Sequence, residues 1–281
     1  MNGAIDPVES LAACGHVCWS YKDRAGFRVR ALEYAASGIA AGQWIEYVGS
    51  GSVEGLRTEL AGLDGMAEHV EAGRVGVSSV ADFYPVVGHS DVVDPVAAVA
   101  ARVAGTEKAL AAGYTGFRAV VDATAMARSA EQRAAFARYE YLLDQKTSVL
   151  PVTALCAYDV SALGGAAVAE LACLHPFTRS GSASFRLYAD EGVEFALAGE
   201  IDLVCRELFN ATLAHTVTLS PGPELVIDGG GLDIIDPRGL LTLVEHGRRA
   251  GATLVIRNGP RFVRRLVELL DLQDVRVEVS T

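Results

Sequence analysis

The chain has 281 residues, of which 51% are hydrophobic and 21% are charged. This length suits one large domain or two ordinary ones, and the apolar share excludes a wholly disordered chain. The formal net charge of −11 argues against direct binding to nucleic acid, which needs clustered positive charge. The sequence has no apolar run of about 18 residues and no basic region typical of a secretory signal. We therefore expect a cytoplasmic protein with no membrane partner, whose five cysteines are reduced.

The first part of the chain alternates β-type runs with helical runs. Runs rich in β-branched and aromatic residues occur at 16–21, 44–50, 74–80, 117–123 and 149–158. Between them lie runs with apolar residues at helical spacing, at 27–42, 52–63, 94–113 and 130–145. This alternation predicts a mostly parallel sheet with helices on both faces.

A second, smaller domain is expected after residue 184. Residues 177–184 are predicted to be a linker because turn-forming Pro, Gly and Ser occur in and just before this stretch. The predicted domains therefore span 10–176 and 185–281. In the second, a hairpin of 185–190 and 193–202 is followed by helices at 203–217, 236–251 and 260–272 and strands at 224–231, 253–258 and 275–280. This pattern predicts a small α/β domain.

An ordered set of short motifs runs through the first domain. The motifs are GHVCWSYKD, SGIAAGQWIEYV, GYTGFRAVVDATA, YEYLLDQ, LCAYD and a final HP. Together they resemble the MEDS domain, the sensory region of a dichloromethane-responsive repressor and of methanogen regulators. The resemblance covers residues 10–176 and implies a RecA/KaiC-like α/β fold. The third motif departs from the family at Asp122, where Glu is frequent, and at Ala125, where Trp is frequent.

Several polar residues of this domain are expected at strand ends, where open α/β sheets bind ligands. Arg118 and Asp122 are four residues apart on an expected strand and share a face, so they must pair or line a cleft. The candidate ligand-binding residues are His16, Tyr21, Arg118, Asp122, Tyr139, Glu140, Tyr158 and His175. The alternative is that Arg118–Asp122 and Tyr139–Glu140 are internal salt bridges and helix-packing residues.

Cysteine and histidine residues near the start of the first domain have a spacing that metal sites can use. Cys14, His16 and Cys18 alternate along one face of an extended segment, and Cys156 or His175 could add a fourth zinc ligand. No residue near them in the sequence supplies the fourth ligand. We therefore expect that Cys18 is buried, that His16 is hydrogen-bonded and that no metal is bound.

The sequence lacks the common phosphate-binding and catalytic motifs. The phosphate-binding string GxxxxGK[ST] is absent, and the nearest stretch, 49–55, lacks the lysine. The sequence contains no nucleophile elbow and no dinucleotide fingerprint. We therefore expect no bound cofactor and no enzymatic activity.

The segment LVIDGGGLDIIDPRGLLTLVEHGRRAGATLVI lies in the second domain. It resembles the core of a STAS domain, the fold of anti-sigma factor antagonists, and the likeness covers 186–279. The resemblance implies a partner-binding surface that includes Asp202, Asp228, Asp236, Arg238 and Gly239. Family members carry an Asp-Ser-Ser/Thr-Gly turn whose hydroxyl is phosphorylated, whereas this chain has Asp-Pro-Arg-Gly. Asp236 suits a helix N-cap and Pro237 the first helical position, so we expect a capped helix that phosphorylation at this turn does not control.

These observations favour a cytoplasmic regulatory protein. A sensory domain with a small-molecule ligand is coupled to a STAS domain that docks an anti-sigma factor or a related signalling protein. One alternative is an enzyme or nucleotide-binding protein built on the RecA-like domain. Another is a STAS scaffold that binds no ligand. Self-association stays open.

Overall fold

The computed structural model describes residues 3–5, 15–147, 149–216 and 222–278. The chain is a mixed α/β protein that divides into two compact units, Met1–Ser182 and Ala183–Thr281. This division falls within the stretch 177–184. Each unit is described by itself below.

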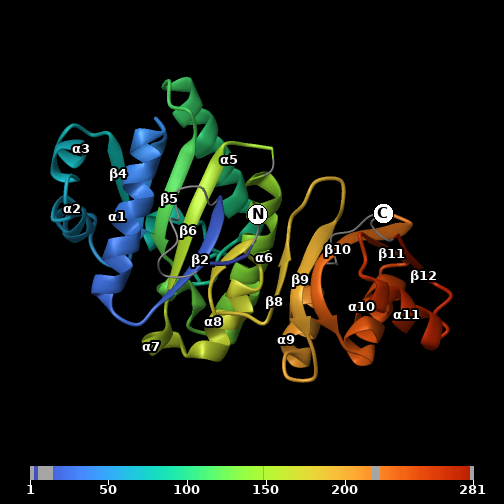
Figure 1. Ribbon diagram of the computed structural model, residues 1–281. Helices are drawn as coiled ribbons and strands as arrows, with labels where there is room; N and C mark the ends of the chain where they lie inside the picture. Colours follow the sequence, from blue (N-terminus) through green and yellow to red (C-terminus); the bar gives the residue numbers. More distant parts are fainter. Residues whose placement is uncertain (1–2, 6–14, 148, 217–221, 279–281) are drawn as a thin grey trace. The chain divides into compact units, whose positions relative to one another are not determined.

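The first unit is built on a seven-stranded sheet in the order β1-β7-β2-β6-β5-β3-β4 (Figure 1). Every described pair of neighbouring strands in it is parallel, in agreement with the α/β pattern of the sequence. The strands are β1 (Gly3–Ile5), β2 (His16–Tyr21), β3 (Trp44–Gly49), β4 (Val75–Ser79), β5 (Phe117–Asp122), β6 (Val152–Asp159) and β7 (Phe177–Arg179).

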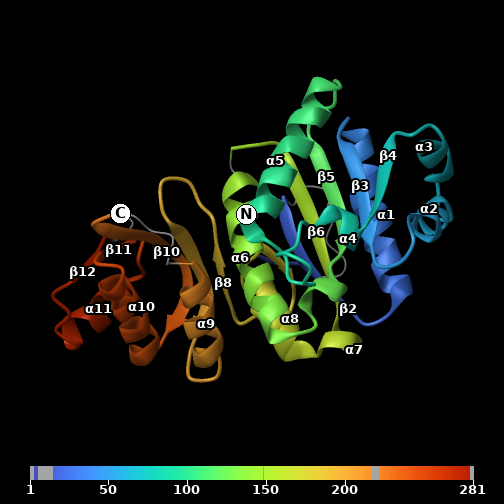
Figure 2. The same ribbon diagram turned by 180° about the vertical axis from the view of Figure 1, so that it is seen from behind.

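Helices cover both faces of this sheet (Figures 1 and 2). One face carries α1 (Arg24–Ala40), α2 (Val53–Ala61) and α3 (Ala67–Glu71). The other face carries α5 (Pro95–Ala111), α6 (Ala130–Thr147) and α8 (Gly165–Ala172). Short helical turns connect these elements at α4 (Val80–Phe83), η2 (Thr124–Ala127) and α7 (Val160–Leu163). None of the helices that the structure describes is both long enough and apolar enough to span a membrane.

Strand β2 shows how this layering places polar groups inside the unit. All six of its residues are buried, as parallel strands between two helical layers require. Because side chains alternate along a strand, Val17, Trp19 and Tyr21 join the core under α1. His16 and Cys18 therefore face the opposite layer, which contains α6 and α8.

The second unit has a five-stranded sheet in the order β12-β11-β10-β9-β8. β8 and β9 form the expected antiparallel hairpin, and the other described pairs are parallel. Its elements are β8 (Phe185–Tyr188), β9 (Phe195–Ile201), α9 (Arg206–Thr216), β10 (Glu224–Ile235), α10 (Pro237–Arg249), β11 (Thr253–Arg257), α11 (Arg261–Leu269) and β12 (Val275–Val277).

Besides the elements β1, α3 and α8, which the sequence did not predict, two segments with a predicted structure differ from that prediction. Residues 177–179, expected at the start of a linker, form β7 and pair with β1 and β2. A strand of three residues is too short to show the alternating pattern that identifies strands. Strand β10 continues beyond residue 231 to Ile235, with register shifts against β9 after Asp228 and Leu232. Glycine makes this close pairing feasible, since a Cβ at Gly231 would lie 2.7 Å from that of Ala198.

Candidate functional site

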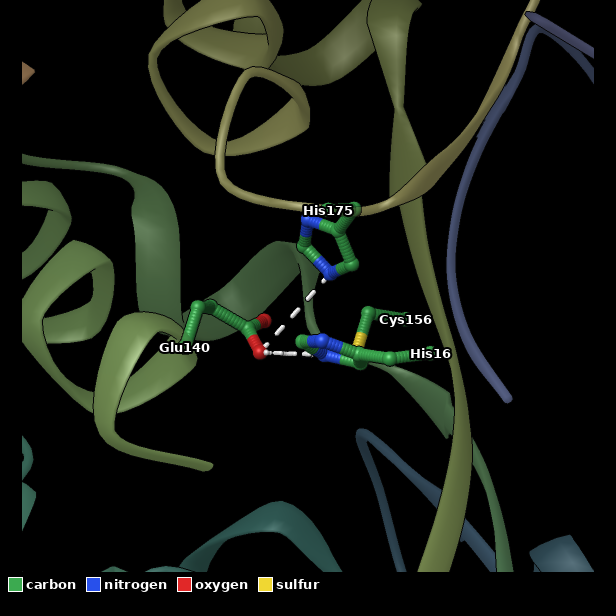
Figure 3. Close-up of side chains that lie close together, drawn as sticks. All are labelled: His16, Glu140, Cys156 and His175. Atoms are coloured by element: carbon green, nitrogen blue, oxygen red, sulfur yellow. Dashed lines mark hydrogen bonds and ion pairs between the residues drawn. The ribbon is translucent and has the colours of Figure 1, made fainter. Parts of the chain in front are cut away.

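Six polar side chains meet inside the first unit, each at most 1% exposed to solvent. They come from β2, β6, α6 and the residue three positions after the end of α8. Figure 3 shows four of them, His16, Glu140, Cys156 and His175. We call this group the buried histidine cluster, and its members are His16, Glu140, Asp144, Cys156, Tyr158 and His175.

The positions of these residues follow from local geometry. His16 begins β2 and lies beside Ala154 of β6, so the next residues on that face of β6 are Cys156 and Tyr158. Glu140 and Asp144 are four residues apart on α6 and therefore share one side of the helix. That side faces β2 and β6.

Glu140 is the hub of the cluster. Its Oε2 lies 3.1 Å from Nε2 of His16, and its Oε1 accepts a 2.7 Å hydrogen bond from the hydroxyl of Tyr158. Asp144 Oδ1 lies 3.0 Å from the other ring nitrogen of His16. The thiol sulfur of Cys156 is 3.7 Å from both Glu140 Oε2 and His16 Nε2. A buried carboxylate thus contacts three polar groups at once.

The two histidines are in opposite electrostatic states. Burial alone would lower the pKa of His16, but hydrogen bonds and charges from Asp144 and Glu140 raise it to about 9. For His175, burial and the charge of His16 outweigh the attraction of Glu140 and lower the pKa to about 3. At neutral pH, His16 is therefore cationic and His175 neutral.

The neutral ring of His175 points a free lone pair at Glu140. Its Nδ1 lies 2.9 Å from the carbonyl of Leu171, and only a protonated nitrogen can donate to a carbonyl. Nε2 is therefore the unprotonated nitrogen, and it lies 3.7 Å from Glu140 Oε2 with no hydrogen-bond partner. A buried polar atom of this kind is unusual, because such groups are normally satisfied.

The thiols of the cluster region are inert as they stand. Burial raises the pKa of both Cys18 and Cys156 well above the ordinary thiol value, and the charge of Glu140 adds to the shift. Neither thiol forms the thiolate that a nucleophile needs at neutral pH. The donor atoms of His16, Glu140, Cys156 and His175 nevertheless lie within 4.8 Å of one another, which is a spacing that a metal ion could occupy.

A second group of polar residues lies where β2 and β5 end. The hydroxyl of Tyr21 donates to Asp122 at 2.9 Å, and Arg24 Nη1 donates to the same oxygen at 2.5 Å. Thr124 donates to the other oxygen at 2.7 Å. Arg24 also pairs with Glu59 at 2.8 Å. We call these five residues the carboxyl-edge cluster.

A crevice of about 330 Å³ adjoins this cluster at Tyr21. Its lining comes from β2, from α1 with the loop before it, and from the last residue of β7. It therefore lies beside the carboxyl end of β2, and the carboxyl ends of strands are where open α/β sheets bind ligands. The crevice is lined by Trp19, Tyr21, Lys22, Asp23, Gly26, Val29, Arg30 and Arg179.

The eight candidate ligand-binding residues do not form one pocket. His16, Glu140, Tyr158 and His175 belong to the buried histidine cluster. Tyr21 and Asp122 belong to the carboxyl-edge cluster, and the remaining two, Arg118 and Tyr139, lie in neither.

Arg118 and Asp122 share a face of β5, as expected, but have different partners. Arg118 donates to Gln43 at 2.7 Å and to the carbonyl of Tyr34 at 3.2 Å, whereas Asp122 pairs with Arg24. Four strand residues span about 13 Å, so the two side chains sit at opposite ends of the strand.

The expected pairing of Tyr139 with Glu140 is also replaced. Adjacent helix residues point in different directions. Tyr139 therefore packs edge-on against Tyr84, with ring centroids 5.3 Å apart, while Glu140 contacts His16.

Sequence reasoning left other members of the two clusters unassigned. Asp144 could have been found from its spacing of four to Glu140 on one helix. Arg24 and Thr124 each follow a strand end by two or three residues and gave no separate signal. Of the three residues considered as metal ligands from the sequence, Cys14 lies outside the described residues, and Cys18 is paired in register with Cys156.

In the second unit, the proposed partner-binding residues occupy the ends of strands and helices. Asp236 caps α10 as expected, accepting a 2.6 Å hydrogen bond from the Gly239 amide. Asp202 follows β9 and accepts 2.9 Å from the Val204 amide. Gly239 is a packing requirement, since a Cβ there would lie 2.8 Å from the Ile201 side chain.

The other two residues of that set are Asp228 on β10 and Arg238 in the first turn of α10. Asp228 precedes the irregular part of β10 and accepts hydrogen bonds from Asn258 and from the Gly230 amide. Arg238 lines a cavity with residues of α9 and α10, including Asn210 and Thr242.

Comparison with known proteins adds one finding. A family model described as the MEthanogen/methylotroph, DcmR Sensory domain (MEDS) matches residues 15–176. This range contains every member of both polar clusters. A search of curated proteins found no match to the chain.

Proposed function

The chain belongs to the MEDS family of sensory domains across residues 15–176, and from this membership we propose that it is a non-enzymatic regulatory protein with two roles. The first unit senses a small molecule, and the second unit docks a signalling protein. The observation that carries the proposal is the match to a sensory family in a chain whose second compact unit lies outside the matched range. The parallel sheet supports, within the same proposal, a RecA/KaiC-like fold for the sensor.

The crevice beside the carboxyl-edge cluster is the proposed ligand site. Lys22, Arg30 and Arg179 line it, with Asp23 as its acidic residue. The guanidinium groups of Arg30 and Arg179 lie 5.0 Å and 5.5 Å from the ring centroid of Trp19, which offers an apolar surface. Cations around an aromatic ring favour a small organic anion such as a short-chain carboxylate.

The second unit is proposed to be a STAS domain that docks an anti-sigma factor or a related protein. The support is its likeness to that family at the Asp236 turn and the position of Asp202 and Asp236 at the ends of neighbouring strands β9 and β10. Pro237 and Arg238 stand where a phosphorylated hydroxyl is expected, so docking is independent of phosphorylation at this turn.

Ligand binding is tested by screening the full chain with short-chain carboxylates, alcohols and halogenated one-carbon compounds. The chain has two tryptophans, so Trp44→Phe leaves Trp19 in the crevice as the single reporter. A true ligand raises the melting temperature by mass action and changes Trp19 fluorescence. Lys22→Ala should weaken both effects, whereas Lys108→Ala, a lysine away from this crevice, should not. A full panel without any shift would contradict the sensor proposal and favour a scaffold without a ligand.

Docking is tested by measuring binding of the full chain to the anti-sigma factors of its own organism. Arg238→Asp reverses the charge at the start of α10 and should abolish binding. The matched control is Arg265→Asp, which makes the same change at an exposed position of α11, away from the cavity that Arg238 lines. Equal binding by both variants, or no binding partner in the set, would contradict the docking proposal.

A further inference from the structure

We infer that His16, Glu140, Cys156 and His175 form a binding site for one divalent transition-metal ion, for which zinc is the best match. The inference concerns the interior of the first unit and does not depend on the proposed ligand or docking partner. Two nitrogens, one oxygen and one sulfur converge from three elements and one connecting segment, as the close-up shows (Figure 3).

Four of the six donor–donor distances are close to those of tetrahedral coordination, and all six are within 4.8 Å. Metal–ligand bonds of about 2.0–2.3 Å put neighbouring donors in a tetrahedral zinc site about 3.3–3.8 Å apart. In the cluster, Glu140 Oε2 lies 3.1 Å from His16 Nε2 and 3.7 Å from His175 Nε2. Cys156 Sγ lies 3.7 Å from both His16 Nε2 and Glu140 Oε2. Small adjustments of buried side chains suffice to surround an ion.

The outer contacts of the ligands match those of metal sites. A metal-binding histidine donates its second ring nitrogen to a carboxylate or a carbonyl, which fixes the ring. His16 meets this requirement through Asp144 at 3.0 Å, and His175 through the carbonyl of Leu171 at 2.9 Å. Tyr158 likewise holds the second oxygen of Glu140 at 2.7 Å.

His175 supplies the independent observation that a ligand belongs here. Its Nε2 is fully buried, lacks a hydrogen-bond partner and faces the carboxylate of Glu140 with a lone pair. Two facing acceptors repel each other unless a cation or a proton lies between them. A metal ion bound by both atoms removes that repulsion.

The chemistry of the donor atoms selects the kind of ion. The Cys156 thiol gives its proton to solvent when its sulfur binds the ion. Thiolate and imidazole donors select zinc and similar ions over magnesium and calcium. Four protein ligands leave no open position, so the site is structural.

The test uses untagged full-length protein, refolded with zinc and with cobalt and then freed of loosely bound metal. We expect one zinc per chain by elemental analysis and, with cobalt, the charge-transfer absorption of a thiolate ligand. Cys156→Ala should remove that absorption and reduce zinc to trace amounts. The matched control is Cys18→Ala, because Cys18 is equally buried and lies beside Cys156 on the neighbouring strand. This control should retain both signals.

A second variant, Asp144→Asn, leaves all four metal ligands in place and tests the inference if Cys156→Ala does not fold. Asp144→Asn changes a residue outside the ligand set and should weaken zinc affinity about 10- to 100-fold, as the loss of outer contacts does in other sites. The inference is overturned if wild-type protein binds less than a stoichiometric amount of zinc. It is also overturned if zinc remains in the Cys156→Ala and Cys18→Ala proteins alike, because the ion then binds elsewhere.

Discussion

The two polar clusters of the first unit use the same chemistry in different surroundings. In each, a carboxylate accepts a tyrosine hydroxyl: Glu140 from Tyr158 at 2.7 Å and Asp122 from Tyr21 at 2.9 Å. The side chain of Glu140 is completely buried, whereas that of Asp122 is 10% exposed and that of its partner Arg24 is 36% exposed. In the buried histidine cluster, no water can take the place of a hydrogen-bond partner that is removed. In the carboxyl-edge cluster, water or a ligand can take that place. The same loss of a contact should therefore cost more in the first cluster than in the second.

The largest effect is expected from Glu140→Ala in chelator-treated protein. The change leaves a cationic His16 buried with one acidic partner, and breaking a buried ion pair costs about 3–5 kcal/mol. Both tryptophans lie in the first unit, so urea unfolding followed by tryptophan fluorescence measures the stability of this unit. Glu131→Ala, on the exposed first turn of the same helix, is the control and should cost less than about 1 kcal/mol. A loss below about 1 kcal/mol for Glu140→Ala would show that the cluster repacks or admits water.

The same substitution, tyrosine to phenylalanine, can be made in both clusters, and the two losses of unfolding free energy can then be compared. Tyr158→Phe and Tyr21→Phe each remove one hydroxyl that donates to a carboxylate. Hydrogen bonds to charged groups are worth about 1.5–3 kcal/mol, and we expect this range for Tyr158. For Tyr21 we expect less than about 1 kcal/mol, because Arg24 and Thr124 remain on Asp122 and water can reach the edge. If the two variants lose equal amounts of unfolding free energy in urea, both clusters exclude water to the same degree.

The sheet of the first unit could be predicted because its strands are buried on both faces. Parallel strands in that situation appear in the sequence as short apolar runs between helical segments, as at 16–21 and 117–122. The alternation within β2 also placed His16 and Cys18 on one face. β7 escaped prediction because three residues carry no pattern of their own.

The contacts of the clusters could not be predicted, because they depend on how helices pack on the sheet. His16 meets Glu140 and Asp144 across 124 and 128 residues of sequence, and only the rotation of α6 decides which of its side chains face β2. The eight candidate ligand-binding residues are dispersed for a simpler reason. Residues at the beginning and at the end of one strand share a face, yet they lie too far apart to line one small site.

A smaller effect is expected for the salt dependence of stability, which should differ between variants of the two clusters. Arg24→Ala removes ion pairs with Asp122 and Glu59 that are partly open to water, so we expect a loss of about 1 kcal/mol or less at low ionic strength. In about 1 M salt the screening length falls to about 3 Å, and the loss should shrink. The loss of unfolding free energy in Glu140→Ala should stay constant when salt is raised, because buried ion pairs are screened much less. The Arg24 guanidinium also packs on Phe27, 4.6 Å from the ring centroid. If the stability loss of Arg24→Ala does not depend on salt, the loss of this packing is its cause.

The smallest effect is expected from the pH dependence of the edge cluster. Burial disfavours the charged form of Glu59, but hydrogen bonds from Arg24 and Arg28 outweigh it and lower its pKa below the ordinary 4.5. A carboxyl whose folded pKa is depressed binds fewer protons in the folded state than in the unfolded state. Its stabilisation is therefore present above pH 4.5 and is lost as the pH falls through the lower folded value.

Glu59→Gln should remove that part of the pH dependence. Because glutamine does not titrate, the difference in unfolding free energy between wild type and Glu59→Gln should be constant from pH 7 to 5 and should narrow as the pH is lowered further. Glu54→Gln, an exposed residue of the same helix, serves as the control and should leave the pH profile close to that of wild type. A difference that widens on acidification would mean that the unfolded chain, and not the folded one, holds the lower pKa.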